Sequence, residues 1–177
     1  MELPYELVPV ELPARLRECV LARDWTELDQ AVALAVAPGG VLFETMRGRA
    51  AGLGIEFREI EFIIAIRSSR EWRDAGHDAY NAYNAYNDED GIWHDDGSRV
   101  LAFSLSLTLG EAAGGRGQVE GGRLEMRRRS SPDEIIASIP TPPYGTMIIF
   151  QTGHGGYEHR IRAVTGGERI IIAGWAT

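Results

Sequence analysis

The chain has 177 residues, a length typical of one compact domain. Its 26 acidic residues outnumber its 18 basic ones, and the net charge of −8 argues against a protein that binds nucleic acid through its overall field. All 18 basic residues are arginine, which excludes a Schiff-base or phosphate-loop lysine, and the single cysteine, Cys19, excludes an internal disulfide and a cysteine-cluster metal site.

The N-terminal part of the chain is predicted to be helical. Apolar residues recur at helical spacing in residues 13–23, which indicates one helix. Asp24, with Glu27 three residues later, forms a capping box at the start of a second helix. The Pro-Gly-Gly sequence of residues 38–40 ends this helix. We expect residues 12–37 to pack on a sheet as a helical hairpin or one bent helix.

From residue 41 onward the sequence favours strands. Apolar residues alternate with others in residues 60–66 and 101–109, the pattern of a strand with one buried face. In the second segment the intervening residues are small or polar, which suits a cavity wall better than open water. Further strands are predicted at residues 41–45, 123–128, 146–150, 159–164 and 169–175. Connections rich in Gly or Pro are predicted at residues 110–122, 130–133 and 140–145. Short strands separated by such turns are typical of a sandwich or barrel.

Two histidines and one aspartate form a candidate metal site. His94 and Asp96 lie two residues apart, so on an extended segment both side chains point to one face, with about 6.6 Å between their Cα atoms. His159, on a later predicted strand, adds a second imidazole. Two histidines and one carboxylate are the ligands of non-haem Fe(II) oxygenases, and they leave three coordination positions open. The alternative for His94 and Asp96 taken alone is a solvated loop pair, because residues 95–98 are turn formers.

The sequence of residues 80–175 resembles the 2-oxoglutarate/Fe(II)-dependent oxygenases, in particular their prolyl-4-hydroxylase-like branch. The resemblance rests on residues that follow the family's order and spacing. These are His94-x-Asp96, Arg99 before an alternating strand, Gly121-Gly122-Arg123-Leu124, Ile139-Pro140, Gly145-Thr146-Met147-Ile148-Ile149-Phe150, His159, Val164, Gly167, Arg169 and Gly174-Trp175. The resemblance implies a mainly β fold, the double-stranded β-helix or jelly roll, with the N-terminal helices packed on the larger sheet. We expect a single domain of residues 1–177, with helical support in residues 1–40 and the β core in residues 41–177.

The resemblance also implies the cofactors and their ligands. Fe(II) is bound by His94, Asp96 and His159, and 2-oxoglutarate and O2 are cosubstrates. The resemblance implies that Arg169, ten residues after His159, binds the C5 carboxylate of 2-oxoglutarate. A planar guanidinium can bind a carboxylate bidentately. If residues 165–167 form a three-residue hairpin loop, Arg169 shares the face of His159, about 13 Å away along the strands. A two-residue loop would turn Arg169 to the opposite face.

Several residues near this site have alternative interpretations. Arg169 could instead form a surface ion pair with Glu158 or Glu168. His154 competes with His159, but it lies in a Gly-rich loop and outside the family's register. Asp95 lacks the spacing of Asp96, and Arg99 is interpreted as structural.

A tyrosine on the strand before the first iron ligand often hydrogen-bonds 2-oxoglutarate in this family. The resemblance therefore implies this role for Tyr83 or Tyr86. Both belong to residues 79–87, which repeat Ala-Tyr-Asn three times, and a replication slip in a tolerant segment explains the repeat equally well. For the basic run of residues 127–129 a solvated strand end is favoured over a binding site for an anionic substrate.

The implied reaction is oxidative decarboxylation of 2-oxoglutarate to succinate and CO₂, coupled to hydroxylation of an unactivated C–H bond. The substrate class is a small molecule, an amino acid or a peptidyl residue, and the acidic charge argues against a nucleic acid. Asp96 argues against halogenation, because related halogenases lack this carboxylate. Two alternatives are a cupin-type metalloenzyme, acting as an isomerase or hydrolase with another divalent ion, and a non-catalytic jelly-roll binding module. The second requires a triad that is too widely spaced to hold a metal.

The sequence predicts a cytoplasmic protein without a membrane partner. Residues 1–6 contain neither the basic segment nor the apolar run of a signal peptide. The longest apolar stretches, residues 31–37 and 170–175, are too short to cross a bilayer.

Overall fold

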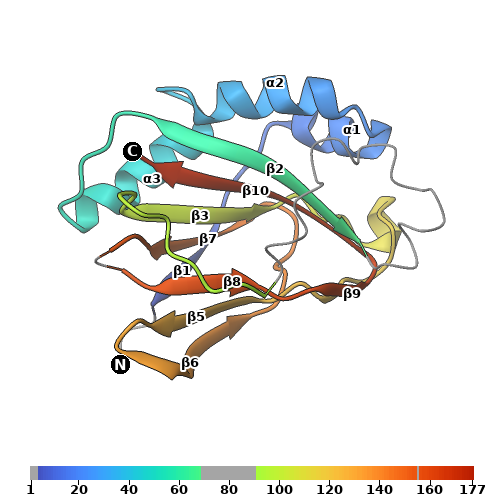
Figure 1. Cartoon of the computed structure of the whole chain (residues 1–177). Coiled ribbons are helices and arrows are strands. Elements are labelled where there is room, and N and C mark those ends of the chain that lie inside the picture. Colours follow the sequence, from blue (N-terminus) through green and yellow to red (C-terminus); the bar gives the residue numbers. More distant parts are fainter. Residues whose placement is uncertain (1–3, 69–90, 155) are drawn as a thin grey trace.

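The computed structural model describes residues 4–68, 91–154 and 156–177. A first strand precedes three helices, and strands follow to the C-terminus (Figure 1). The N-terminal elements are β1 (Tyr5–Pro9), α1 (Ala14–Ala22), α2 (Trp25–Val36) and α3 (Val41–Gly52). The remaining elements are β2 (Ile60–Ser68), β3 (Leu101–Ser106), a 3₁₀ turn (Glu111–Ala113), β4 (Glu120–Gly121), β5 (Leu124–Arg128), β6 (Ser131–Ile139), β7 (Thr146–Gln151), β8 (Glu158–Ile161), β9 (Val164–Gly166) and β10 (Glu168–Ala176).

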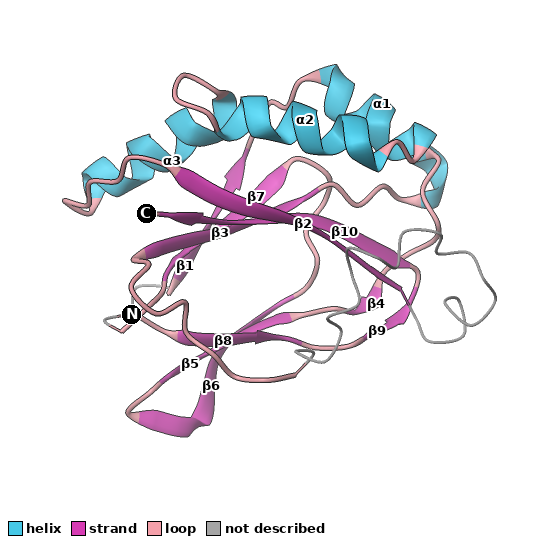
Figure 2. Ribbon diagram, turned by 45° about the horizontal axis from the view of Figure 1, so that its top comes forward, coloured by secondary structure: helices cyan, strands magenta, loops and turns pink. Residues whose placement is uncertain are grey.

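Two antiparallel sheets face one another, and the helices cover the outer face of the larger one (Figure 2). The larger sheet has five strands in the order β1-β7-β3-β10-β2, and the smaller has three in the order β6-β5-β8. The short strands β4 and β9 pair with each other at one end. The predicted mainly β architecture, with N-terminal helices packed on the larger sheet, is confirmed. In the described residues no helix is both long and apolar enough to span a membrane.

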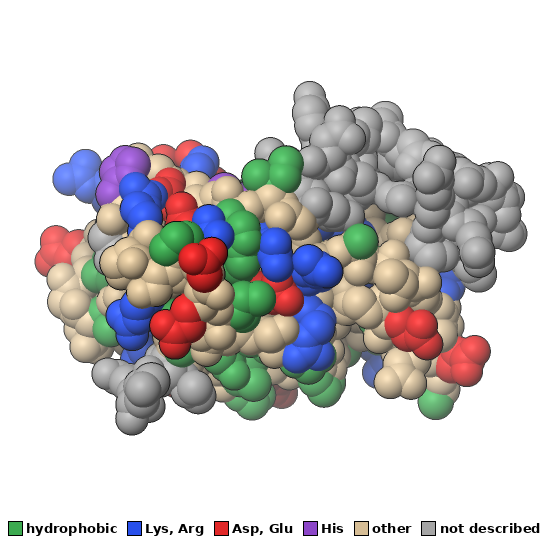
Figure 3. All heavy atoms as spheres, turned by 60° about the horizontal axis from the view of Figure 1, so that its bottom comes forward, with side chains coloured by type: hydrophobic (Ala, Val, Ile, Leu, Met, Phe, Trp, Pro, Cys, Tyr) green, Lys and Arg blue, Asp and Glu red, His purple; other side chains and the backbone are tan. Residues whose placement is uncertain are grey.

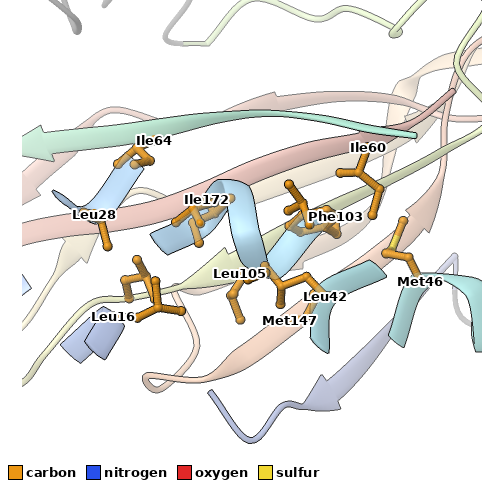
Figure 4. Packing of buried hydrophobic residues seen from close by; sticks show 14 of the residues in the cluster. Leu16, Leu28, Leu42, Met46, Ile60, Ile64, Phe103, Leu105, Met147 and Ile172 are labelled. Atoms are coloured by element: carbon orange, nitrogen blue, oxygen red, sulfur yellow. The ribbon is translucent and has the colours of Figure 1, made fainter. Parts of the chain in front are cut away.

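Alternation along the strands of the larger sheet separates two cores. In β3, Leu101, Phe103 and Leu105 point toward the helices and join the main hydrophobic cluster, which Figure 4 shows from close by. Ala102 belongs instead to the cluster between the two sheets, and all six residues of β3 are buried. The small or polar face of this strand is therefore covered by the smaller sheet, as the alternation predicts.

The helix boundaries follow local signals, with one correction. The Asp24 side chain accepts a hydrogen bond from the Glu27 backbone N–H at 3.0 Å, which confirms Asp24 as the N-cap. The reciprocal half of the predicted capping box does not form, because the Asp24 N–H donates to Cys19 O and the Glu27 carboxylate pairs with Arg15. The strand predicted at residues 41–45 is wrong, because α3 begins at Val41. Its buried residues are spaced for one face of a helix, and packing of that face on the sheet outweighs the β propensity of the first residues. These residues are Leu42, Phe43, Met46 and Ala50.

Three strands, β1, β4 and β6, lie where none was predicted, and all three are at sheet edges. β1 pairs with β7. β4 falls within the connection predicted at residues 110–122, and β6, which pairs with β5, begins within the connection predicted at residues 130–133. The strand predicted at residues 159–164 is divided into β8, in the smaller sheet, and β9, which pairs with β4. The division of the domain at residue 40 stays a prediction.

Gly174 is required where β10 passes Phe103. A Cβ atom at this position would lie 2.3 Å from Phe103 Cε1, and the Phe103 ring is 1% exposed and cannot move aside. We expect Gly174→Ala to lower the free energy of unfolding by about 1–3 kcal/mol, the usual cost of overpacking. Urea denaturation measures this change.

The matched control is Gly48→Ala within α3, where an added Cβ would meet nothing within 4 Å. This substitution should raise the free energy of unfolding by about 0.5–1 kcal/mol through the helix propensity of alanine. Equal destabilisation by both substitutions would contradict the packing explanation.

Candidate metal centre and its cavity

The structure brings His94, Asp96 and His159 together. One ligand atom from each residue lies within 4.8 Å of the others. His159 Nε2 is 3.8 Å from Asp96 Oδ2, and the two imidazole ring centroids are 4.4 Å apart. His159 is 7% exposed and Asp96 is 9% exposed, whereas His94 is half-buried, so two of the three residues are shielded from bulk water.

Backbone pairing explains why residues so distant in sequence converge. His94 and His159 form an antiparallel bridge, in which His94 N–H donates to His159 O at 3.1 Å and His159 N–H donates to His94 O at 2.9 Å. Gly91 N–H donates to Ile161 O at 2.7 Å. The segment that carries His94 and Asp96 thus extends along the free edge of β8. Because side chains alternate, both face the same side as His159.

Neighbouring groups orient the potential ligand atoms. His94 Nδ1 lies 3.1 Å from Ile92 O, and a proton on Nδ1 leaves the lone pair of Nε2 available. The Thr152 hydroxyl donates to Asp96 Oδ2 at 2.5 Å. The Phe150 ring meets the His159 ring edge-on, with 4.9 Å between centroids.

The protonation state of His159 also suits metal binding. Burial lowers the pKa of His159 to about 4, and the nearby Asp96 carboxylate only partly opposes this effect. The imidazole is therefore neutral at pH 7, which is the form that binds metals. Two imidazoles and one carboxylate on one side of a cavity fit a divalent transition metal, and Fe(II) in particular.

The hydrogen bond from Thr152 gives a prediction for metal affinity. Thr152→Val keeps the shape of this buried side chain but leaves Asp96 Oδ2 without its donor. We expect the dissociation constant for Mn(II), measured by calorimetry, to rise about 10-fold, the lower end of the effect of groups that orient ligands.

The control for this variant is Thr45→Val. The Thr45 hydroxyl donates to Val41 O at 2.7 Å within α3, away from the cluster. Mn(II) affinity should not change in this variant. An unchanged affinity in Thr152→Val would show that the hydrogen bond does not support the metal centre.

A cavity of about 130 Å³ lies between the two sheets beside the cluster. His94 and His159 line one side of it, and residues of β2, β3 and β10 line the other. The lining from the larger sheet is mainly small or apolar and consists of Ile63, Ala65, Arg67, Ala102, Phe103, Ser104, Phe150, Arg169, Ile171, Ala173 and Trp175. The interior face of β3 is therefore a cavity wall, as predicted.

Arg169 lines the same cavity and is 1% exposed. Its Nε donates to Thr141 Oγ1 at 3.2 Å. This burial contradicts the alternative of a surface ion pair. Glu158 and Glu168, the suggested partners, instead bind Arg127 at 2.8 Å and Arg23 at 2.9 Å.

The hairpin geometry considered for Arg169 is wrong. β8 and β10 belong to different sheets, and β9 lies between them in the chain. Arg169 therefore does not share a strand face with His159. It reaches the cavity from the larger sheet, opposite the histidines.

Among the described residues, the other candidates do not join the cluster. Tyr83, Tyr86, His77 and the Ala-Tyr-Asn repeat fall outside the described residues. The side chain of His154 is 75% exposed, with Nδ1 3.8 Å from Asp95. Asp95 accepts a hydrogen bond from Gly97 N–H at 2.9 Å and forms an ion pair with Arg129. Arg99 binds Glu61 and stacks on the Trp175 ring at 5.0 Å, which fits its structural interpretation.

The basic run of residues 127–129 is not simply a solvated strand end. Arg127 binds Glu158, Arg128 stacks on Tyr157 at 5.6 Å, and Arg129 binds Asp95.

Sequence reasoning missed the contacts of Thr152 and Thr141, because neither residue stands in a recognisable pattern.

Comparison with solved structures supports the fold. A prolyl-4-hydroxylase of Pseudomonas putida superposes with a TM-score of 0.58 and 18% identity, over 98% of this chain and 84% of that one. A prolyl hydroxylase of Trichoplax adhaerens gives a TM-score of 0.42 and 11% identity, over 98% and 83%. A 2OG-Fe(II) oxygenase family protein of Burkholderia pseudomallei gives 0.38 and 17%, over 68% and 43%. The first of these likenesses confirms the jelly roll.

No curated protein sequence matches this one significantly. The family model of the 2OG-Fe(II) oxygenase superfamily, however, matches residues 79–177, which is more than half of the chain. The matched range includes the smaller sheet, strands β3, β7 and β10 of the larger sheet, and the whole cluster. The cofactors of this superfamily are Fe(II), 2-oxoglutarate and O2, and the described donor set fits the first of them. On these grounds the chain belongs to the 2OG-Fe(II) oxygenase superfamily and is a 2-oxoglutarate-dependent non-haem iron oxygenase.

Proposed function

We propose that this enzyme couples oxidative decarboxylation of 2-oxoglutarate to hydroxylation of an unactivated C–H bond. His94, Asp96 and His159 are the proposed iron ligands, and Arg169 is the proposed partner of the C5 carboxylate. The observation that carries this proposal is the shared cavity, which a buried guanidinium and two imidazoles of the cluster line from opposite sheets.

When bound, Fe(II) supplies the centre at which 2-oxoglutarate is chelated and O2 is reduced. The residues of the chain contribute binding, orientation and exclusion of water. Arg169 offers two parallel N–H donors and a full positive charge to a carboxylate in a site of low dielectric constant. The Thr152 hydroxyl holds Asp96 Oδ2, and the neutral imidazole of His159 presents Nε2 toward that carboxylate.

The proposed substrate is a small molecule or a peptidyl residue with an aliphatic group at the reacting carbon. Ile63 lines the cavity and is 50% exposed, so the cavity can be reached from outside along β2. Ala65, Ala173 and Trp175 continue this apolar wall. Such a wall excludes water and favours binding of an aliphatic group over a polar one.

Succinate formation tests the proposal. The purified protein is reconstituted anaerobically with Fe(II) and then given 2-oxoglutarate, ascorbate and air without substrate. We expect slow, iron-dependent succinate formation that is absent in His94→Ala. The same assay then screens candidate substrates for stimulation of turnover.

Two results together would overturn the proposal. These are no succinate and no 2-oxoglutarate binding, by calorimetry, to protein that still binds a divalent metal. That combination would favour the cupin-type metalloenzyme. The non-catalytic module required a widely spaced triad, and the ligand atoms lie within 4.8 Å of one another.

A further inference from the structure

We propose that Trp93 is a positioning residue, which fixes the segment carrying His94 and Asp96 by stacking with two arginines of the smaller sheet. The inference rests on the proposed function, in which these two residues and His159 bind the metal. The juxtaposition involves Trp93, Arg127 of β5 and Arg160 of β8, here termed the Arg–Trp stack.

The Arg–Trp stack consists of two close contacts. The guanidinium carbon of Arg127 lies 4.4 Å from the Trp93 ring centroid, and that of Arg160 lies 4.3 Å from it. Both distances are well within the range of a cation–π interaction. The side chains of Arg127 and Arg160 are 19% and 17% exposed, so the contacts are partly desolvated and stronger than at an open surface.

Acidic partners hold both arginines in place. Arg127 Nε lies 2.8 Å from Glu158 Oε2, and Arg160 Nε lies 2.8 Å from Glu125 Oε2. Each ion pair joins β5 to β8. Contacts within the sheet therefore hold the two guanidinium groups where they meet Trp93.

The metal-binding segment depends on contacts of this kind because its backbone pairing is short. His94 and His159 form an isolated bridge outside the named strands, and Gly91 adds one hydrogen bond. Side chains alternate along an extended segment, so His94 and Asp96 face the cavity while Trp93 and Asp95 face outward.

The contacts of the outward-facing Trp93 and Asp95 therefore determine where the neighbouring metal-binding side chains lie. Trp93 attaches the segment to β5 and β8, and Asp95 attaches it to Arg129. A slip of one residue in the pairing with β8 would turn His94 and Asp96 away from His159. Such a slip would also remove Trp93 from its contacts with the two arginines, so the stack opposes it.

The same contacts explain the basic run of residues 127–129. Figure 3 shows the outer face of the smaller sheet, where arginine and acidic side chains are interspersed rather than gathered by sign. A surface built to bind an anionic polymer would leave its cations available. On this face Arg127 and Arg160 are instead engaged in ion pairs with Glu158 and Glu125 and in contacts with Trp93.

The test measures metal affinity, which a purely structural role would leave unchanged. Mn(II) is titrated anaerobically into the full chain by calorimetry, and thermal unfolding is followed in parallel. Wild type should bind Mn(II), and His159→Ala should not. Trp93→Leu should raise the dissociation constant about 10- to 100-fold. Trp93→Phe keeps an aromatic face and should restore most of the affinity.

Trp25→Leu is the matched control. Arg23 stacks on the Trp25 ring at 4.8 Å, but Trp25 lies at the start of α2, on the far side of the larger sheet. This control should lower the melting temperature without changing the Mn(II) affinity. If Trp93→Leu does not fold, Arg127→Gln and Arg160→Gln take its place, and each should weaken Mn(II) binding severalfold.

The outcomes separate the two proposals. A folded Trp93→Leu with wild-type affinity, equal losses in Trp93→Leu and Trp93→Phe, or unchanged affinity in both arginine variants would each overturn the positioning role. The proposed metal site would stand in all three cases. Mn(II) binding that is absent in wild type, or retained in His159→Ala, would overturn the proposed site itself.

Discussion

His159→Ala is expected to abolish Mn(II) binding and to lower succinate formation by at least about 10³-fold, which corresponds to about 4 kcal/mol of activation free energy. The side chain supplies one of three ligand atoms and is 7% exposed, so a water molecule cannot readily replace it in the same geometry. Because burial lowers the pKa of His159 to about 4, the substitution removes a neutral group and leaves no buried charge unpaired. The fold should therefore survive.

His154→Ala provides the control for this prediction. It removes a histidine five residues earlier whose side chain is 75% exposed. Both variants are compared by calorimetry with Mn(II) and by succinate formation. Wild-type behaviour in His159→Ala, or a loss confined to His154→Ala, would show that the ligand assignment is wrong.

Arg169→Gln is expected to raise the dissociation constant for 2-oxoglutarate at least about 30-fold, because truncating one partner of a buried charge pair costs about 2–5 kcal/mol. The guanidinium is 1% exposed at the cavity wall, where its attraction for a carboxylate is little weakened by water. Arg169→Lys keeps the charge but loses the planar pair of donors, so its effect should be intermediate. Calorimetry on Mn(II)-loaded protein measures each constant.

The affinity for Mn(II) itself should change little in Arg169→Gln, which separates this prediction from the first. Arg162→Gln, at an exposed position between β8 and β9, is the control for loss of one positive charge. Equal 2-oxoglutarate affinities in wild type and Arg169→Gln would assign the C5 carboxylate to another residue.

Alternation along short segments was the most informative feature of the sequence for the site. It indicated that His94 and Asp96 share a face, and the structure has them on one side of the segment beside β8. The role of His159 required the family resemblance, because no local pattern connects residues so far apart. The hydrogen bond from Thr152 to Asp96 spans 56 residues and results from tertiary structure alone.

The errors in the fold have local physical causes. Residues 41–45 contain β-branched and aromatic residues, but burial at Leu42, Met46 and Ala50 follows a helical period. β6 is exposed along most of its length, so it has little of the alternation that marks a half-buried strand. The hairpin considered for Arg169 is wrong because no sequence signal marks the point after β8 where the chain leaves the smaller sheet.

The two faces of β3 and β10 have a consequence for how such enzymes diverge. Leu105 and Ile172 point toward the helices and stabilise the fold, whereas Ser104 and Ala173 line the cavity. A substitution on the cavity side changes the shape and polarity offered to a substrate while the contacts with the helices remain. Selection for a new substrate can therefore act on every second residue of these strands at little cost to thermodynamic stability. Neighbouring residues of one strand thus carry separate properties, since one residue can change with the substrate while the next maintains stability.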